Sequence, residues 1–211
     1  MSSTLFEPKS VGSLSVKNRF VRSATWEGMA QEDGSCTANL VELTRELAEG
    51  EVGLIVSSHA FVIPEGQAGP WQLGIHDDKC IPGLRQMVTA AHEGGSSIVV
   101  QLAHAGLQAA TQLTKMEAMG PSRLPREDGT HCKEMTLAEI QQTVDAFLAA
   151  AVRARDAGFD GVQLHAAHGY LLSQFLSPYY NQRQDEFGGS TEDRARIVLN
   201  ILERIKATLG S

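Results

Sequence analysis

The densest group of chemically capable side chains in this 211-residue sequence is His165-Ala-Ala-His168-Gly-Tyr170. Two imidazoles at this spacing can both point at one oxygen atom, and neutral imidazoles can donate N–H hydrogen bonds to a developing oxyanion. A tyrosine hydroxyl can deliver a proton to the same reacting group. A histidine pair can also bind a metal ion, and histidine is often only structural. The cluster therefore indicates a carbonyl-polarising site, with a metal site and a structural role as alternatives.

A second candidate is Gln101, which lies near the end of the apolar run 98–102. Its amide offers a donor and an acceptor, which complement a heterocycle edge carrying a carbonyl and an N–H. An amide satisfied by neighbouring backbone groups is the alternative. Residues 23–26 add small side chains followed by an aromatic one, which would let a planar ligand approach the backbone but would also suit a tight turn.

A sequence pattern that recurs along the chain must position these side chains. It consists of an amphipathic helix, one or two glycines, a short apolar run and a polar cluster. Short apolar strands that alternate with helices predict an α/β fold with a parallel sheet covered by helices. We expect strands over 19–23, 53–59, 97–104 and 161–165, and helices over about 37–50, 82–94, 137–157 and 191–209.

Boundary signals support the longest of these helices. Thr136-Leu-Ala-Glu139 is a capping box at its start, and Gly158 is a stop signal at its end. In parallel α/β folds ligands lie at the carboxyl ends of the strands. Five polar side chains fall at or just after predicted strand ends, namely His59, Gln101, His104, His165 and His168.

The connection from about 106 to 135 is too long for a plain turn between a strand and a helix. It contains Pro121, Pro125 and Gly129, which disfavour regular structure. Since it leaves the ligand-facing end of the third predicted strand, we expect a substrate lid there rather than a linker.

Composition narrows the class of protein. There are 18 basic and 25 acidic side chains, a net charge of −7, which disfavours a nucleic-acid partner. No window approaches about 18 apolar residues, so no membrane span is expected, and the N-terminus lacks the apolar core of a signal peptide. Cys36, Cys80 and Cys132 form no CxxC pair, which argues against a disulfide framework, a zinc ribbon or an iron–sulfur cluster. We expect a cytoplasmic protein.

Taken in order, several motifs resemble those of the Old Yellow Enzyme family of FMN-dependent NAD(P)H:flavin oxidoreductases and ene-reductases. The resemblance is greatest to the bacterial branch that includes the 2,4-dienoyl-CoA reductases and NADH oxidases. Each motif is weak alone, whereas five in the right order make a chance match improbable. They are Lys17-Asn-Arg19, Gln101-Leu-Ala-His-Ala-Gly106, His165-Ala-Ala-His-Gly-Tyr-Leu171, Gln174-Phe-Leu-Ser-Pro178 and Asn181-Gln-Arg-Gln-Asp-Glu-Phe-Gly-Gly-Ser190.

The resemblance implies an FMN cofactor, NAD(P)H as the reductant and an enone or enoyl substrate. Hydride would pass from the nicotinamide to flavin N5 and then to the β-carbon of the alkene. In this scheme Gln101 binds the pyrimidine edge of the flavin, His165 and His168 hold the substrate carbonyl, and Tyr170 donates a proton. The flavin would be lined by Ser23, Ala24, Thr25, Trp26, His59 and Ala60.

The sequence departs from the family in two ways. Trp26 stands where relatives often carry Cys or Thr, so Thr25 would take that role with a shifted register. The family's fold is a TIM barrel of eight βα units, and residues 1–211 would supply only its first four, as a partial FMN-binding barrel. Strands five to eight, with an arginine near the flavin and the phosphate-binding loops, would be missing.

A half-barrel leaves two open strand edges and an uncovered, apolar inner face. The alternative function is therefore a truncated, non-catalytic half-barrel that associates through its edges, as a homo-oligomer for example. A third hypothesis is a metal-dependent barrel hydrolase that uses His59, His165 and His168, although no Asp or Glu accompanies them at the strand ends.

Overall fold

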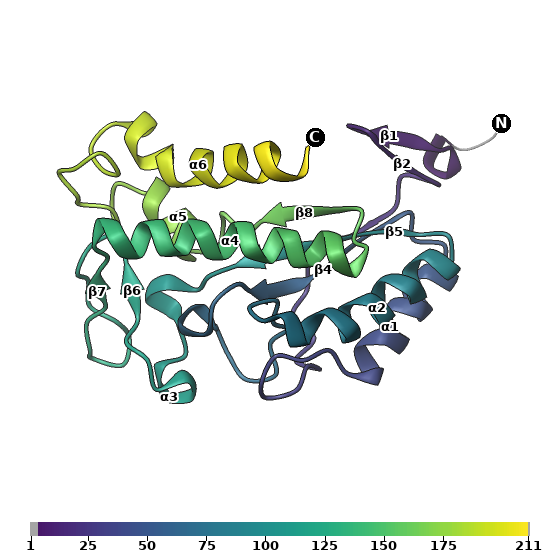
Figure 1. Ribbon diagram of the computed structural model, residues 1–211, viewed down its shortest axis with the longest axis horizontal. Coiled ribbons are helices and arrows are strands. Elements are labelled where there is room, and N and C mark those ends of the chain that lie inside the picture. Colours follow the sequence, from purple (N-terminus) through teal and green to yellow (C-terminus); the bar gives the residue numbers. More distant parts are fainter. Residues whose placement is uncertain (1–3, 211) are drawn as a thin grey trace.

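The computed structural model describes residues 4–210, and its centre is a four-stranded parallel sheet (Figure 1). The strands are, in spatial order, β3 (Val21–Arg22), β4 (Leu54–Phe61), β5 (Ser97–Ala103) and β8 (Gly161–Leu164). After them come α1 (Ala38–Glu49), α2 (Ile81–Glu93), α4 (Leu137–Ala157) and α6 (Thr191–Leu209). Sequential strands are spatial neighbours, so the predicted α/β fold of four βα units is confirmed.

The capping signals at both ends of α4 act as predicted. The Thr136 hydroxyl accepts a hydrogen bond from the backbone N–H of Glu139, while the Glu139 carboxylate accepts one from the backbone N–H of Thr136 at 2.8 Å. At the other end Gly158 has a φ of 98°, a left-handed conformation that glycine adopts without a steric penalty. The helix therefore spans the predicted residues.

The main core lies between the sheet and the helices. Along β5 the side chains of Ile98, Val100 and Leu102 are fully buried, whereas the alternate residues Val99 and Gln101 are only half-buried. Successive side chains of a strand point to opposite faces of the sheet. The buried residues of β5 therefore face the helices, and Val99 and Gln101 lie on the opposite, inner face. Burying each large apolar side chain contributes about 1.5–3 kcal/mol.

The inner face of the sheet differs from the apolar surface that we expected. Apolar side chains lie near the amino ends of the strands, and Val21 on β3 is 55% exposed there. The carboxyl half carries the polar residues Gln101 and Gln163 instead, and the amide of Gln163 is exposed. Within residues 4–210 neither β3 nor β8 pairs with a further strand, so both edges are open.

A hairpin of β1 (Lys9–Val11) and β2 (Leu14–Val16), which the sequence did not predict, lies at the amino ends of the strands (Figure 1). The Lys17 ammonium group donates hydrogen bonds to the carbonyls of Ala48 at 3.3 Å and Gly94 at 2.8 Å. Both carbonyls lie at helix C-termini, where partial negative charge favours a cation. Lys17 thus ties the hairpin to α1 and α2.

The connection between β5 and α4 is ordered, not structureless. It contains α3 (Thr111–Thr114), β6 (Met119–Gly120) and β7 (Lys133–Glu134), at the carboxyl ends of the strands (Figure 1). A helix that was not predicted, α5 (Leu171–Leu176), precedes α6. The remaining elements are four 3₁₀ turns at Thr4–Phe6, Pro64–Gly66, Asp78–Cys80 and Gly106–Gln108.

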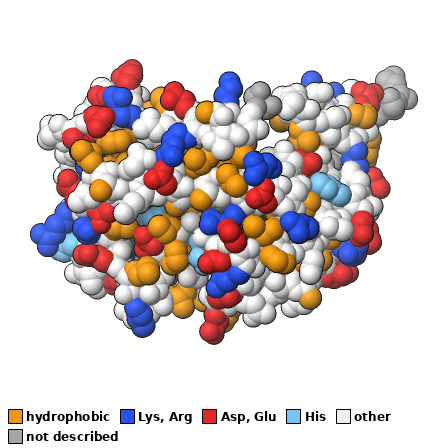
Figure 2. All heavy atoms as spheres, in the orientation of Figure 1, with side chains coloured by type: hydrophobic (Ala, Val, Ile, Leu, Met, Phe, Trp, Pro, Cys, Tyr) orange, Lys and Arg blue, Asp and Glu red, His pale blue; other side chains and the backbone are white. Residues whose placement is uncertain are grey.

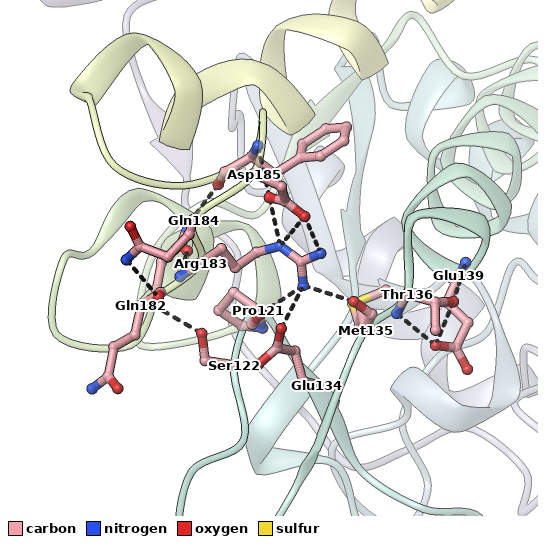
Figure 3. A network of polar contacts seen from close by, with 12 residues as sticks. Pro121, Ser122, Glu134, Met135, Thr136, Glu139, Gln182, Arg183, Gln184 and Asp185 are labelled. Carbon is pink, nitrogen blue, oxygen red and sulfur yellow. Dashed lines mark hydrogen bonds and ion pairs between the residues drawn. The ribbon is translucent and has the colours of Figure 1, made fainter.

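A buried arginine fastens this connection to the segment after α5 (Figure 3). The Arg183 guanidinium donates to the carbonyls of Pro121 at 2.9 Å and Met135 at 2.6 Å. Its other edge forms an ion pair with Asp185 at 2.6 Å. The backbone N–H of Gln182 also donates to the Ser122 hydroxyl. Residues 121–122 and 135 of the connection are thus all hydrogen-bonded to the segment after α5. These bonds hold the connection in place at the carboxyl ends of the strands.

The helix-covered surface carries interspersed acidic and basic side chains (Figure 2). Ion pairs join neighbouring elements, such as Arg45 with Glu93 at 2.8 Å and Arg153 with Asp78 at 2.7 Å. Such exposed pairs contribute little stability individually, and a mixed surface does not favour a polyanion. No helix within residues 4–210 has an apolar stretch long enough to cross a membrane.

Candidate functional site

Four candidate side chains converge at the carboxyl end of the sheet. His59 comes from β4, while His165, His168 and Tyr170 come from the loop after β8. The His165 ring centroid lies 5.1 Å from that of His168 and 4.7 Å from that of Tyr170. The His59 centroid lies 5.7 Å from Tyr170 and 6.1 Å from His165. The predicted clustering at the strand ends is therefore confirmed for His59, His165 and His168. His104 is instead buried, with its ring next to Gly66.

A sharp reversal of the chain brings the two histidines of the loop together. His168 has a φ of 57° and Gly169 a φ of 68°, so two consecutive residues are left-handed. This conformation is uncommon for a residue with a side chain and must be held by its surroundings. The Gln108 amide holds it from one side, since it donates to the carbonyls of His168 and Gly169, each at 3.0 Å.

From the other side the same turn is held by Gln174, whose side chain is fully buried in α5. Its amide nitrogen donates to the Gly169 carbonyl at 2.5 Å and the Ala105 carbonyl at 3.2 Å, and its oxygen accepts from the N–H of Leu107 at 3.1 Å. A Cβ atom on Gly106 would lie 2.4 Å from that oxygen, which is why only glycine fits there. Gln174 thus joins the loops that follow β5 and β8.

Burial fixes the protonation states of the cluster. Burial, together with the nearby His168, lowers the pKa of His59 to about 4. Burial, with His59 and His168 beside it, likewise lowers the pKa of His165 to about 4. Burial raises the pKa of the Tyr170 phenol. At neutral pH the site therefore presents two neutral imidazoles and a protonated phenol, all of which can donate hydrogen bonds.

Next to the histidines lies a pair of amides. Gln101 is the register partner of His59 on the neighbouring strand, and its amide nitrogen donates to the Gln163 side-chain oxygen at 2.7 Å. This bond uses the Gln101 nitrogen and the Gln163 oxygen, so the Gln101 oxygen remains as an acceptor and the Gln163 nitrogen as a donor. Sequence reasoning missed Gln163, although a residue two positions before His165 must point to the same face of a strand.

Residues 23–26 form the other wall. The Trp26 side chain is 50% exposed and lies edge-on to His59, with the ring centroids 6.3 Å apart. Ser23 is exposed, Ala24 is half-buried, and the Thr25 hydroxyl donates to the Ser23 carbonyl at 3.2 Å. Of residues 23–26, Trp26 is thus the one whose side chain the structure places beside a histidine of the cluster.

Ala60 does not lie on the inner face as a flavin-lining side chain would. It is fully buried in the main core, and its register partner Leu102 points toward the helices. The neighbouring His59 points to the opposite face, as strand geometry requires. The expected role of Ala60 as a flavin-lining residue is therefore wrong for its side chain, since the residue is 0% exposed.

The donor set suits a flat heterocycle better than a metal ion. The hydrogen-bonded amides of Gln101 and Gln163 offer one further acceptor and one further donor, the groups that complement a ring edge carrying an N–H and a carbonyl. Among residues 4–210 no group of three or more His, Cys, Asp or Glu side chains is arranged to hold a metal ion. The hydrolase hypothesis thus gains no support from the geometry, and the residues present fit the ring of FMN.

Known proteins share both the sequence and the fold. The model of the NADH:flavin oxidoreductase / NADH oxidase family matches residues 4–211. The sequence is 40% identical over 209 residues to an NADH oxidase of Thermoanaerobacter brockii, covering 98% of this chain and 32% of that protein. The fold is similar to that of an Old Yellow Enzyme homologue from Zymomonas mobilis, with a TM-score of 0.92, 32% identity, and 99% and 61% of the two chains covered.

A 2-naphthoyl-CoA reductase in complex with 2-naphthoyl-CoA is also similar, with a TM-score of 0.95, 30% identity, and 100% of this chain and 34% of that chain covered. The chain thus spans 32–61% of the length of these three relatives. Its parallel strands and outer helices match a portion of the TIM barrel of the Old Yellow Enzymes. The match over residues 4–211 shows that this chain belongs to the NADH:flavin oxidoreductase / NADH oxidase family, the family of the Old Yellow Enzymes.

Proposed function

We propose that this chain provides the carbonyl-polarising part of an FMN-dependent oxidoreductase that passes hydride from NAD(P)H to a carbonyl-conjugated alkene. The observation that carries the proposal is the pair of imidazoles at His165 and His168, whose ring centroids are 5.1 Å apart beside the Tyr170 phenol. Two N–H donors of this kind meet the negative charge that develops on the substrate carbonyl oxygen.

FMN, when bound, would supply the hydride-transfer chemistry between the nicotinamide and the alkene. The chain's own residues would orient the two reactants. Gln101 and Gln163 offer an acceptor and a donor to the pyrimidine edge, while Trp26 and residues 23–25 border the ring. His165 and His168 bind the carbonyl oxygen, which makes the β-carbon electrophilic. Tyr170 then delivers its phenolic proton to the α-carbon, for which the raised pKa keeps it protonated.

Two relatives support this choice of reactants. One similar structure is a morphinone reductase in complex with tetrahydroNAD, with a TM-score of 0.89 and 29% identity. Another holds 2-naphthoyl-CoA, whose carbonyl is conjugated with an aromatic ring. A nicotinamide analogue and a carbonyl-conjugated compound are therefore each bound by a protein of this fold. Because the chain spans only part of each relative, the reaction of the whole enzyme is part of the proposal.

The test is a titration of the purified chain with FMN, followed by flavin fluorescence. We expect the Gln101→Leu variant to bind FMN about tenfold more weakly, because it loses about 1–1.5 kcal/mol of hydrogen bonding at the ring edge. The Gln142→Leu variant, altered at an exposed residue of α4, should bind as the parent does. Bound flavin should bleach with NADH or NADPH and recover its colour with 2-cyclohexenone. A chain that takes up no FMN contradicts the proposal.

The second candidate is a non-catalytic half-barrel that associates through its edges, and the exposure of the β3 edge favours it. Val21 is 55% exposed and neither edge strand has a further partner within residues 4–210. Exposed strand edges readily pair with another chain. Light scattering should then give a mass of at least twice 22.7 kDa. A monomer without FMN affinity would exclude this function as well as the first.

A further inference from the structure

His59 has a position that the mechanism above does not use. It lies near the end of β4 and is only 9% exposed, with its imidazole close to the rings of Trp26, His165 and Tyr170. Its Nε2 atom lies 3.4 Å from the Tyr170 hydroxyl oxygen. It is thus the side chain that the structure pairs with the phenol of the proton donor.

Which atom donates in this pair decides where the phenolic proton points. If the Tyr170 hydroxyl donates to Nε2, its proton is directed at His59 and away from a substrate above the sheet. If Nε2 carries the proton and donates, the phenolic O–H is free to turn toward the substrate. The 3.4 Å separation is long for a hydrogen bond, as is common where catalytic contacts tighten only when the substrate binds.

We propose that His59 is a positioning residue for Tyr170, carrying its proton on Nε2 and donating it in a hydrogen bond to the phenolic oxygen. The inference rests on the proposed function, in which Tyr170 is the proton donor. During that step the Tyr170 O–H bond breaks while a C–H bond forms at the substrate α-carbon. The electron pair stays on the phenolic oxygen, where the Nε2–H of His59 meets the negative charge.

Two features of the site support this arrangement. Burial keeps the His59 imidazole neutral at neutral pH, so the ring has a single N–H, and its position on Nε2 or Nδ1 decides whether His59 donates to Tyr170. Neighbouring rings also surround the imidazole. The Trp26 ring lies edge-on to it with the centroids 6.3 Å apart, and the His165 ring lies edge-on to it at 6.1 Å. An imidazole packed among other rings can set the direction of the neighbouring hydroxyl.

The test uses ¹⁵N-labelled chain without flavin or substrate, so it does not depend on catalysis. A long-range ¹H–¹⁵N spectrum of the histidine rings reports which nitrogen carries the proton, and a His59→Gln variant assigns the His59 signals. We expect the Nε2–H tautomer for His59 and a shift of its Nε2 signal in the Tyr170→Phe variant. The matched Tyr180→Phe variant should leave that signal in place.

Two outcomes would overturn the proposal. They are protonation of His59 on Nδ1, and an Nε2 signal that stays in place when Tyr170 loses its hydroxyl. The ring of His76, which stacks on Phe61 away from this cluster, is the internal control and should be unaffected by either tyrosine variant. A chain with the expected tautomer that nevertheless binds no FMN would refute the proposed function alone, so the two failures can be told apart.

Discussion

Replacing Gln174 by leucine should weaken the fold at the loop that carries the catalytic histidines. The side chain is fully buried, and its amide makes three hydrogen bonds, with the carbonyls of Ala105 and Gly169 and the N–H of Leu107. Leucine is similar in size, so little cavity forms, but the three hydrogen bonds are lost. The Leu107 N–H is left unpaired, whereas the carbonyls of Ala105 and Gly169 each keep one hydrogen bond from Gln108. At about 1 kcal/mol for each hydrogen bond, the loss is about 3 kcal/mol. For a chain of this size that lowers Tm by about 6–12 °C.

The assay is thermal unfolding followed by circular dichroism, with urea unfolding as the equilibrium check. The matched control is Gln142→Leu, the same exchange at an exposed helical position, which should change Tm by about 1 °C or less. If Gln174→Leu melts within 2 °C of the parent, as judged against the roughly 2–4 °C per kcal/mol expected, its amide does not hold the loop. The account of the His168–Gly169 turn would then be wrong.

Three further outcomes are expected. Glu27→Gln removes the partner of Arg22 in a pair 2.6 Å apart and should cost about 1–3 kcal/mol in urea unfolding, and exchanging the two residues should restore at least half of it. Burial lowers the pKa of His104 to about 4 in the folded chain, so stability should fall as the pH drops from 6.5 to 4, and His104→Asn should flatten a Tm–pH series over that range. Phe147→Ala, at a fully buried site, should cost about 3–5 kcal/mol, against less than 1 kcal/mol for Leu148→Ala, if packing decides the effect.

The regular part of the fold is predictable because local signals and burial agree there. The helix of residues 137–157 has a capping box, an apolar stripe and a glycine at its end, and its bounds match the structure. The hairpin of β1 and β2 gave no such signal, because its strands have three residues each and five of the six are not buried. Within the 106–135 connection the sequence predicts no short helices or strands, because these elements depend on tertiary contacts such as those of Arg183. That the connection covers a substrate stays a prediction.

The topology predicts which side chains of the site lie near one another, but not the hydrogen bonds between them. Parallel strands end at one edge, which is enough to bring His59, Gln101 and His165 together. The amide contacts are not predictable in this way, because they join segments that are distant in the sequence. Gln101 and Gln163 are 62 positions apart, and Gln174 lies 67 positions from Leu107. No local pattern reports such pairs, and only the strand register placed Gln163 beside Gln101.

The left-handed backbone at His168 also limits which variants of this position can exist. A φ of 57° is tolerated by glycine and, at some cost, by asparagine, aspartate and histidine, whereas β-branched side chains clash with the backbone there. In a library of all substitutions at this position, most variants would be destabilised by the backbone conformation, whatever their effect on the reaction. Asparagine meets both requirements, because it tolerates a left-handed backbone and still offers an N–H donor. The evolutionary choices at this position of the site are accordingly few.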